Sequence, residues 1–179
     1  IWTIPLGGEW RGGKDWRAAR GARKGGRAMI IADLATIPGG TFPAQRWGRG
    51  LVGQATQPIQ AKGFSMGFSV LAPKGGQVPW HNQEQEEIYF IVEGTGEACL
   101  GEEKREVKGG QALYIPPTTF HQLTNTGDTP MTMIYVYAPG GDVAHWRQEL
   151  EGTLPVAGVD VPALPEGAQP QCTKKPEDE

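Results

Sequence analysis

Short apolar segments alternate with turn residues through the middle of the chain, from residue 63 to residue 138. Each segment is rich in β-branched or aromatic side chains and is followed by glycine, proline, asparagine or aspartate, a pattern typical of strands joined by tight turns. The predicted strands are 64–71, 77–83, 87–92, 96–100, 104–107, 111–115, 120–125 and 131–137. Strands this short and this closely spaced predict an all-β fold, an antiparallel sandwich or barrel.

The segments on either side of the barrel have different patterns. Residues 1–62 form an irregular N-terminal extension in which one apolar segment, 28–37, predicts an added strand. After the barrel, 63–140, residues 142–150 predict one short helix, and the proline-rich stretch 151–179 predicts an arm wrapped on the surface or partly disordered. The N-terminal extension carries a basic run between Arg11 and Arg27, which we interpret as a solvated arm.

Composition narrows the class of protein. The net charge of −3 argues against nucleic-acid binding by the whole molecule, and no apolar run approaches the roughly 20 residues of a membrane-spanning helix. The sequence has no secretory-signal pattern, and Cys99 and Cys172 match neither a disulfide framework nor a zinc-finger spacing. We therefore expect a cytoplasmic protein whose partner is a small molecule, with no nucleic acid and no membrane.

Metal-binding side chains gather in three of the predicted strands. His81 and Gln83 are two residues apart, so they point to the same face of their strand. Glu87 opens the next strand, and His121 follows the Pro116-Pro117 break much later in the chain. If the strand of His121 lies opposite the other two, all four side chains converge inside the barrel.

These four side chains suit one divalent metal ion. Neutral imidazole supplies nitrogen, Glu87 supplies a charged oxygen, and the Gln83 amide supplies a weaker neutral oxygen. Such a set suits Fe(II), Mn(II), Ni(II), Co(II) or Zn(II), and two histidines with one carboxylate are associated with non-haem iron oxygenases. We expect one ion per subunit, with Fe(II) favoured, and catalytic roles for Glu87 and Gln83.

The sequence around the first three ligands, His81, Gln83 and Glu87, resembles the first motif of the cupin family. That motif reads glycine, five residues, His-x-His, three or four residues, glutamate, six residues, glycine. In this chain the fixed positions are Gly75, His81, Gln83, Glu87 and Gly94, at the same spacing.

The second cupin motif is also matched. It reads glycine, five residues, Pro-x-Gly, two residues, histidine, three residues, asparagine. Its fixed positions fall on Gly110, Pro116, Thr118, His121 and Asn125. The resemblance covers about fifty residues and implies a double-stranded β-helix, or jelly-roll barrel, of a small single-domain, metal-dependent cupin enzyme.

Two positions depart from the motifs. Gln83 stands where the family has its second histidine, and it would bind the metal, hold a metal-bound water or face the substrate. Thr118 replaces a glycine, which we expect to alter only a turn. In either case the set of two histidines and one glutamate remains.

The resemblance leaves three functions open. The first is a mononuclear non-haem dioxygenase, an oxidoreductase that acts on a small aromatic or dicarbonyl compound and takes dioxygen as co-substrate. The second is an oxygen-independent isomerase, decarboxylase or lyase that uses Mn, Ni or Zn. The third is a non-catalytic module that binds a small ligand. Cupin barrels often pair through sheet edges, so we also expect a homodimer.

Strand alternation predicts the walls of the substrate pocket. Tyr89 shares the face of Glu87, and Met66, Met133 and Tyr135 lie on the predicted inward faces of their strands. These side chains favour an aromatic or otherwise apolar substrate, and no arginine or lysine within the motif strands is placed to hold a phosphate.

We interpret the third histidine of the chain as a structural residue and not as a metal ligand. His145 lies beside Asp142 and Trp146 in the predicted helix, and we expect it on the surface.

Overall fold

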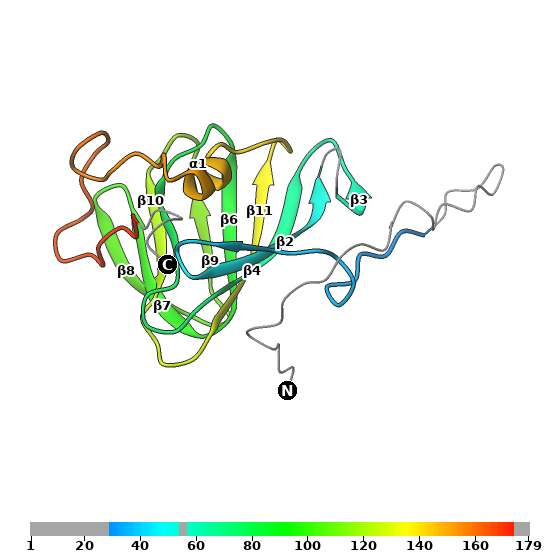
Figure 1. Cartoon of the computed structure of the whole chain (residues 1–179), viewed down its shortest axis with the longest axis horizontal. Helices are drawn as coiled ribbons and strands as arrows, with labels where there is room; N and C mark the ends of the chain where they lie inside the picture. The colour runs from blue at the N-terminus through cyan, green and yellow to red at the C-terminus, as the bar shows by residue number, and fades with distance from the viewer. Residues whose placement is uncertain (1–28, 54–56, 174–179) are drawn as a thin grey trace.

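Eleven strands and one helix make up the part of the chain that the computed structural model describes, residues 29–53 and 57–173 (Figure 1). The strands are β1 (Gly40–Phe42), β2 (Arg46–Gly53), β3 (Ile59–Gln60), β4 (Ser65–Leu71), β5 (Gln77–His81), β6 (Glu86–Glu93), β7 (Thr95–Leu100), β8 (Glu103–Lys108), β9 (Ala112–Ile115), β10 (His121–Asn125) and β11 (Met131–Ala138). The helix is α1 (His145–Glu151).

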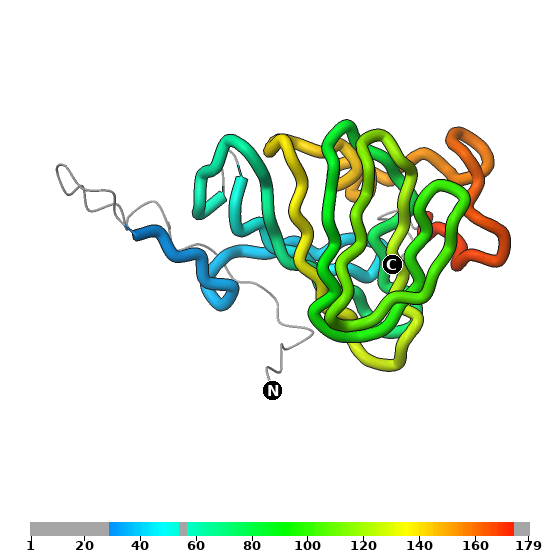
Figure 2. Tube along the Cα trace, turned by 180° about the vertical axis from the view of Figure 1, so that it is seen from behind, coloured from blue at the N-terminus to red at the C-terminus, as the bar shows by residue number. Residues whose placement is uncertain are grey.

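Two sheets face each other across the core (Figures 1 and 2). The seven-stranded sheet has the order β1-β2-β4-β11-β6-β9, with β3 added beside β2, and the four-stranded sheet has the order β5-β10-β7-β8. Every pairing is antiparallel except that of β2 with β3. The predicted all-β class is therefore confirmed.

Strand alternation sorts the side chains into a core and an outer face. In β6, Glu87, Tyr89 and Ile91 are buried, whereas the residues between them are exposed. The buried side chains of both sheets form one cluster, which includes Leu71, Val78, Ile115, Leu123 and Met133.

The strands β5 and β10 are buried along their whole length, which alternation alone does not explain. The C-terminal segment lies along the outer face of their sheet (Figure 2). There Trp80 Nε1 donates a hydrogen bond to the Pro162 carbonyl at 2.9 Å, and Gln122 Nε2 donates one to the Gln169 carbonyl at 2.8 Å. This segment therefore covers polar and aromatic side chains that would otherwise face solvent.

The helix α1 covers one end of the sandwich (Figure 1). Trp146 packs edge-on against Phe42, with ring centroids 5.0 Å apart, and against Tyr135 at 5.3 Å. The helix ends at Gly152, whose positive φ of 64° suits glycine and stops the helix. Its buried residues are His145 and Glu149, which are four positions apart and therefore lie on one face.

The N-terminal extension differs from its prediction. No strand forms at residues 29–37, and Ala28 and the basic run lie outside the described residues. The strands of this extension are β1, β2 and β3. The longest of them, β2, carries arginine and glycine in place of alternating apolar residues, so its sequence does not predict a strand.

Within the described residues, no helix has the length and apolar character needed to cross a membrane.

Candidate metal centre

Three predicted ligands come together between the sheets. His81 and His121 are directly paired in the register of β5 and β10, and their ring centroids lie 4.2 Å apart. Glu87 comes from β6 of the opposite sheet, and its Oε2 lies 3.4 Å from His121 Nε2. All three are buried, and one ligand atom from each falls within a group whose atoms lie within 4.8 Å of one another. The site is thus a three-residue set that can hold a metal ion.

Backbone carbonyls fix the orientation of both imidazole rings. His81 Nδ1 is 2.7 Å from the Pro79 carbonyl oxygen, and His121 Nδ1 is 2.9 Å from the Thr119 carbonyl oxygen. Since a carbonyl only accepts, each Nδ1 carries the hydrogen, which in a neutral imidazole leaves the lone pair on Nε2. Burial, together with the neighbouring His121, lowers the pKa of His81 well below its usual value, which favours the neutral form that binds metals.

Several buried atoms at this site have no hydrogen-bond partner. They are His81 Nε2 and Glu87 Oε2, and both amide atoms of Gln83, in the loop after β5, are unpaired as well. Buried polar atoms are nearly always satisfied, so unpaired acceptors in one place indicate a group that binds there. Lone pairs of nitrogen and carboxylate oxygen are the chemistry that a divalent transition metal requires, so these residues fit such an ion.

The predicted strand 77–83 is shorter in the structure, because β5 ends at His81 and Gln83 lies in the loop that follows. This loop is tied to the second motif. The Thr118 N–H donates a hydrogen bond of 2.7 Å to the Gln83 carbonyl, and Asn82 Nδ2 donates one of 3.2 Å to the Thr118 carbonyl. Thr118 has a φ of 61°, the left-handed conformation that glycine adopts without strain, which accounts for the glycine of the motif at this position. The substitution keeps the turn, and the Gln83 amide remains buried beside it.

Tyr89 lies directly against the ligands. Its hydroxyl is 3.2 Å from His121 Nε2, and since that nitrogen accepts, the tyrosine donates. Burial and the nearby Glu87 raise the pKa of Tyr89 well above its usual value, so its proton stays in place.

A small cavity lies beside Glu87, between the sheets and the helix α1. Its volume is about 10 Å³, roughly the space of one water molecule. It is lined by Arg46, Ser69, Val78, Glu87, Tyr89, Met133, Tyr135, His145 and Trp146.

The cavity includes three of the four predicted pocket residues, Tyr89, Met133 and Tyr135. Met66 differs from its prediction, because in β4 the buried inward positions fall on Ser65, Gly67 and Ser69 and Met66 lies on the other face. The central inward position is a glycine because the ring of Tyr135 fills this space, and a Cβ on Gly67 would collide with it.

The prediction that His145 lies on the surface is wrong. It is 4 % exposed, and its ring lies 3.7 Å from that of His81, measured between centroids. The spacing of His145 and Glu149, four residues apart on one helix face, is the signal that sequence reasoning missed.

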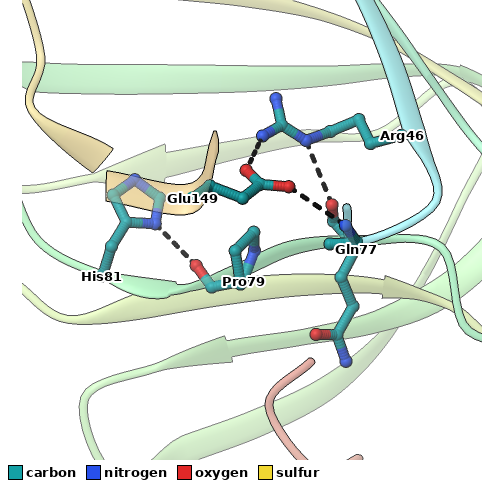
Figure 3. A network of polar contacts seen from close by, with 6 residues as sticks. Arg46, Gln77, Pro79, His81 and Glu149 are labelled. Atoms are coloured by element: carbon teal, nitrogen blue, oxygen red, sulfur yellow. Dashed lines mark hydrogen bonds and ion pairs between the residues drawn. The ribbon is translucent and has the colours of Figure 1, made fainter. Parts of the chain in front are cut away.

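Arg46 is a second residue of the cavity that sequence reasoning missed. It is 1 % exposed, forms an ion pair with Glu149, and donates from Nε to the Gln77 carbonyl at 3.1 Å (Figure 3). Its guanidinium also lies over the rings of Phe42 and Trp146. The cavity therefore has a cation in its wall, although that cation is already paired.

A larger groove of about 350 Å³ opens between the edge strands β8 and β9. Its apolar wall includes Leu100, which pairs with His121 in the register of β7 and β10, and Leu113, which pairs with Tyr89. Paired residues share a sheet face, so the wall of the groove continues the inward faces that carry the metal ligands.

Comparison with known proteins identifies the family. The family model for the cupin domain matches residues 67–137. Uncharacterized protein MJ1618 of Methanocaldococcus jannaschii is 35 % identical over 86 residues, which cover 47 % of this chain and 69 % of that protein. Protein SchB of Streptomyces halstedii is 31 % identical over 99 residues, or 52 % of this chain and 70 % of that protein.

A solved structure agrees in fold. The polyketide cyclase RemF from Streptomyces resistomycificus matches with a TM-score of 0.52 and 21 % identity over 62 % of this chain and 80 % of that one. The chain belongs to the cupin superfamily, and the predicted jelly-roll barrel is confirmed.

Proposed function

We propose that this chain is a metal-dependent cupin enzyme, and specifically a mononuclear non-haem dioxygenase that acts on a small aromatic or dicarbonyl compound. The observation that carries the proposal is the buried set of His81, Glu87 and His121, whose ligand atoms lie within 4.8 Å of one another. Two histidines and one carboxylate with open positions form the arrangement found in non-haem Fe(II) oxygenases, so Fe(II) is the proposed ion, with Mn(II), Ni(II), Co(II) and Zn(II) as alternatives.

A bound ion of this kind would polarise substrate oxygens or bind dioxygen. The protein itself would hold the ion and orient the side chains that bind it. The Pro79 and Thr119 carbonyls fix the two imidazoles, and the sheets exclude water from the space around them. Once His121 Nε2 is engaged, the Tyr89 hydroxyl is free to donate to a substrate oxygen.

The groove between β8 and β9 is the proposed substrate site. Its volume of about 350 Å³ lies within the range of small-molecule pockets, roughly 300–1,000 Å³. Leu100, Val107 and Leu113 give it an apolar wall, whereas Arg105 and Glu103 supply charge at its rim. A flat molecule with a few oxygens suits these walls better than a sugar phosphate does.

Oxygen consumption tests this function. Protein purified from its own host and assayed in an oxygen electrode with catechol-like, phenolic and diketone compounds is expected to take up one dioxygen per substrate consumed. Purification from the native host avoids a wrong metal, because intrinsic affinities favour Cu, Zn and Ni over Fe and Mn. Equal turnover under strict anaerobiosis would reject the dioxygenase. Absence of turnover, with a rise in melting temperature on adding ligand, would identify a binding module instead.

The second candidate is carbonyl chemistry without dioxygen, as in an isomerase, decarboxylase or lyase. It is favoured by Tyr89, a hydrogen-bond donor beside the ligands that could bind a substrate oxygen, and is in keeping with the fold likeness to a protein named a polyketide cyclase. Turnover of a diketone under nitrogen, with no oxygen uptake in air, would select it over the dioxygenase.

We also propose that two copies pair through the outer face of the seven-stranded sheet. Ile88, Phe90, Val92 and Tyr114 lie on neighbouring positions of β6 and β9 and are between 41 % and 52 % exposed. Contiguous exposed apolar surface of this kind marks association sites, and a second copy presents the same surface in a two-fold arrangement.

Sedimentation velocity measures this pairing. The parent protein is expected to sediment as a dimer and Phe90→Lys as a monomer, because the lysine places a charge in the apolar contact. Glu106→Lys, an exposed position on β8 of the other sheet, is the matched control and is expected to remain dimeric. A monomeric parent across micromolar concentrations would contradict the proposal.

A further inference from the structure

His145 lies against the metal centre although it comes from outside both motifs. It is the first residue of α1, and its ring centroid is 3.7 Å from that of His81, closer than the 4.2 Å between His81 and His121. Like those two residues, it is at least nine-tenths buried. Two of the three imidazoles at this site are metal ligands under the proposed function.

The separation of the rings suits ligands of one ion. A metal–nitrogen bond of about 2.1 Å puts each ring centroid roughly 3.2 Å from the ion, so two imidazoles at a right angle have centroids about 4.5 Å apart. The His81–His121 separation of 4.2 Å is close to this value, and the His81–His145 separation of 3.7 Å is shorter and corresponds to a narrower angle. Because no His145 nitrogen belongs to the group whose ligand atoms lie within 4.8 Å of one another, coordination by His145 requires its side chain to move toward the other ligands.

One ring nitrogen of His145 lacks a hydrogen-bond partner. Its Nδ1 is buried and has no hydrogen-bond partner. His81 Nε2 and Glu87 Oε2 are unpaired in the same region, and His145 lines the cavity that Glu87 also lines. Packing of an aromatic ring does not require a buried unpaired nitrogen, and phenylalanine would pack there without that cost.

A buried ion pair holds the helix that carries this histidine. His145 and Glu149 lie on one face of α1, and the Glu149 carboxylate pairs with Arg46 of β2 and accepts from the Ala44 N–H (Figure 3). The helix is therefore anchored with His145 over the metal centre, at the end of the sandwich that Figure 1 shows covered by α1.

We propose that His145 is a fourth protein ligand of the metal ion, delivered by α1 to a site whose first motif carries Gln83 in place of a second histidine. This inference rests on the proposed metal centre. It assigns to the ion three imidazoles and one carboxylate, with the helix as part of the coordination shell.

Titration of the metal-free protein with Co(II) tests the assignment, because the visible absorption of Co(II) reports on its coordination. His145→Phe keeps a ring against His81 and removes both nitrogens. It is expected to weaken Co(II) binding at least about tenfold, since loss even of groups that only orient metal ligands costs about 10–100-fold, and to change the absorption of the bound ion. Arg147→Gln, on the exposed side of the same helix, is the matched control and is expected to titrate like the parent.

The outcomes separate the two proposals. If His121→Ala abolishes Co(II) binding while His145→Phe keeps the parent's affinity and spectrum, the role of His145 is overturned and the metal centre stands. If the parent itself fails to bind Co(II), the proposed function and the fourth ligand are overturned together. A variant that only lowers the melting temperature of the metal-free protein, with the Co(II)-dependent rise in that temperature intact, also identifies His145 as packing alone.

Discussion

Replacing His121 by alanine is expected to remove most of the metal from the purified protein. The residue is fully buried, its Nε2 lies 3.4 Å from the Glu87 carboxylate, and its Nδ1 is fixed by a backbone carbonyl. The other two histidines of the chain, His81 and His145, lie on β5 and α1, so β10 has no second imidazole. The loss in affinity should be about 100-fold or more, because changes to groups that merely orient metal ligands already cost about 10–100-fold. His81→Ala and Glu87→Ala should behave in the same way.

Elemental analysis of protein from the native host gives the first measurement. The matched control is Gln83→Ala, which removes a weak neutral donor from the neighbouring loop and should lose less metal than the other three variants. Melting temperature gives a second measurement, since an ion at 100 times its dissociation constant stabilises the parent by about 2.7 kcal/mol and should not stabilise His121→Ala. Full metal content in a folded His121→Ala protein would refute the proposed site.

The positions of the three ligands could be predicted because each depends on local geometry. Side chains in a strand alternate between its faces, so the spacing of His81, Glu87 and His121 within short strands fixes the faces that they share with their neighbours. The spacing of the two motifs then supplies the pairing between β5 and β10, which alternation by itself does not define. The structure brings these residues together as the sequence indicates.

The residues that escaped prediction depend on distant partners. Arg46 is buried in a strand without an alternating pattern, and the residue that makes its burial tolerable, Glu149, lies 103 positions later in the chain. Charged side chains are rarely buried without such a partner, so nothing in the sequence marks either residue as part of the core. The same ion pair determines that the face of α1 with His145 and Glu149 is the buried one.

Met66 shows a third limit. Alternation identifies two faces of β4 and does not say which is inward, and the larger side chains are the natural choice for the core. Here the inward face carries Ser65, Gly67 and Ser69, because Tyr135 from the neighbouring β11 occupies the space. A large side chain on one strand is matched by a small one on the paired strand. The sequence of a single strand therefore does not show which of its faces is inward.

Glu149→Gln is expected to cause the largest loss of stability among single substitutions in α1. The side chains of Glu149 and Arg46 are 3 % and 1 % exposed, so the substitution leaves the arginine charge buried without its counter-ion. Breaking a buried pair in this way costs about 3–5 kcal/mol, which for a chain of this length lowers the melting temperature by roughly 10 °C. Differential scanning calorimetry of the metal-free protein measures the change.

Arg147→Gln is the matched control for this loss. It removes the pair between Arg147 and Asp142, whose side chains are 57 % and 72 % exposed, on the same helix. Solvent screens such a pair, so the melting temperature of Arg147→Gln should stay close to that of the parent. Equal effects of Glu149→Gln and Arg147→Gln would mean that the buried pair contributes no more than a surface pair.

The double variant Arg46→Met/Glu149→Met distinguishes stability from positioning. Replacing both partners by apolar side chains removes the desolvation cost together with the attraction, so much of the lost stability should return. The ion pair, however, also fixes the helix in one register over the core, a geometric constraint that two methionines do not impose. If the double variant regains its melting temperature yet binds Co(II) more weakly than the parent, the pair serves chiefly to hold α1 over the metal centre. If it regains both, the apolar contacts of Trp146 with Phe42 and Tyr135 are sufficient to seat the helix, and the charges are dispensable.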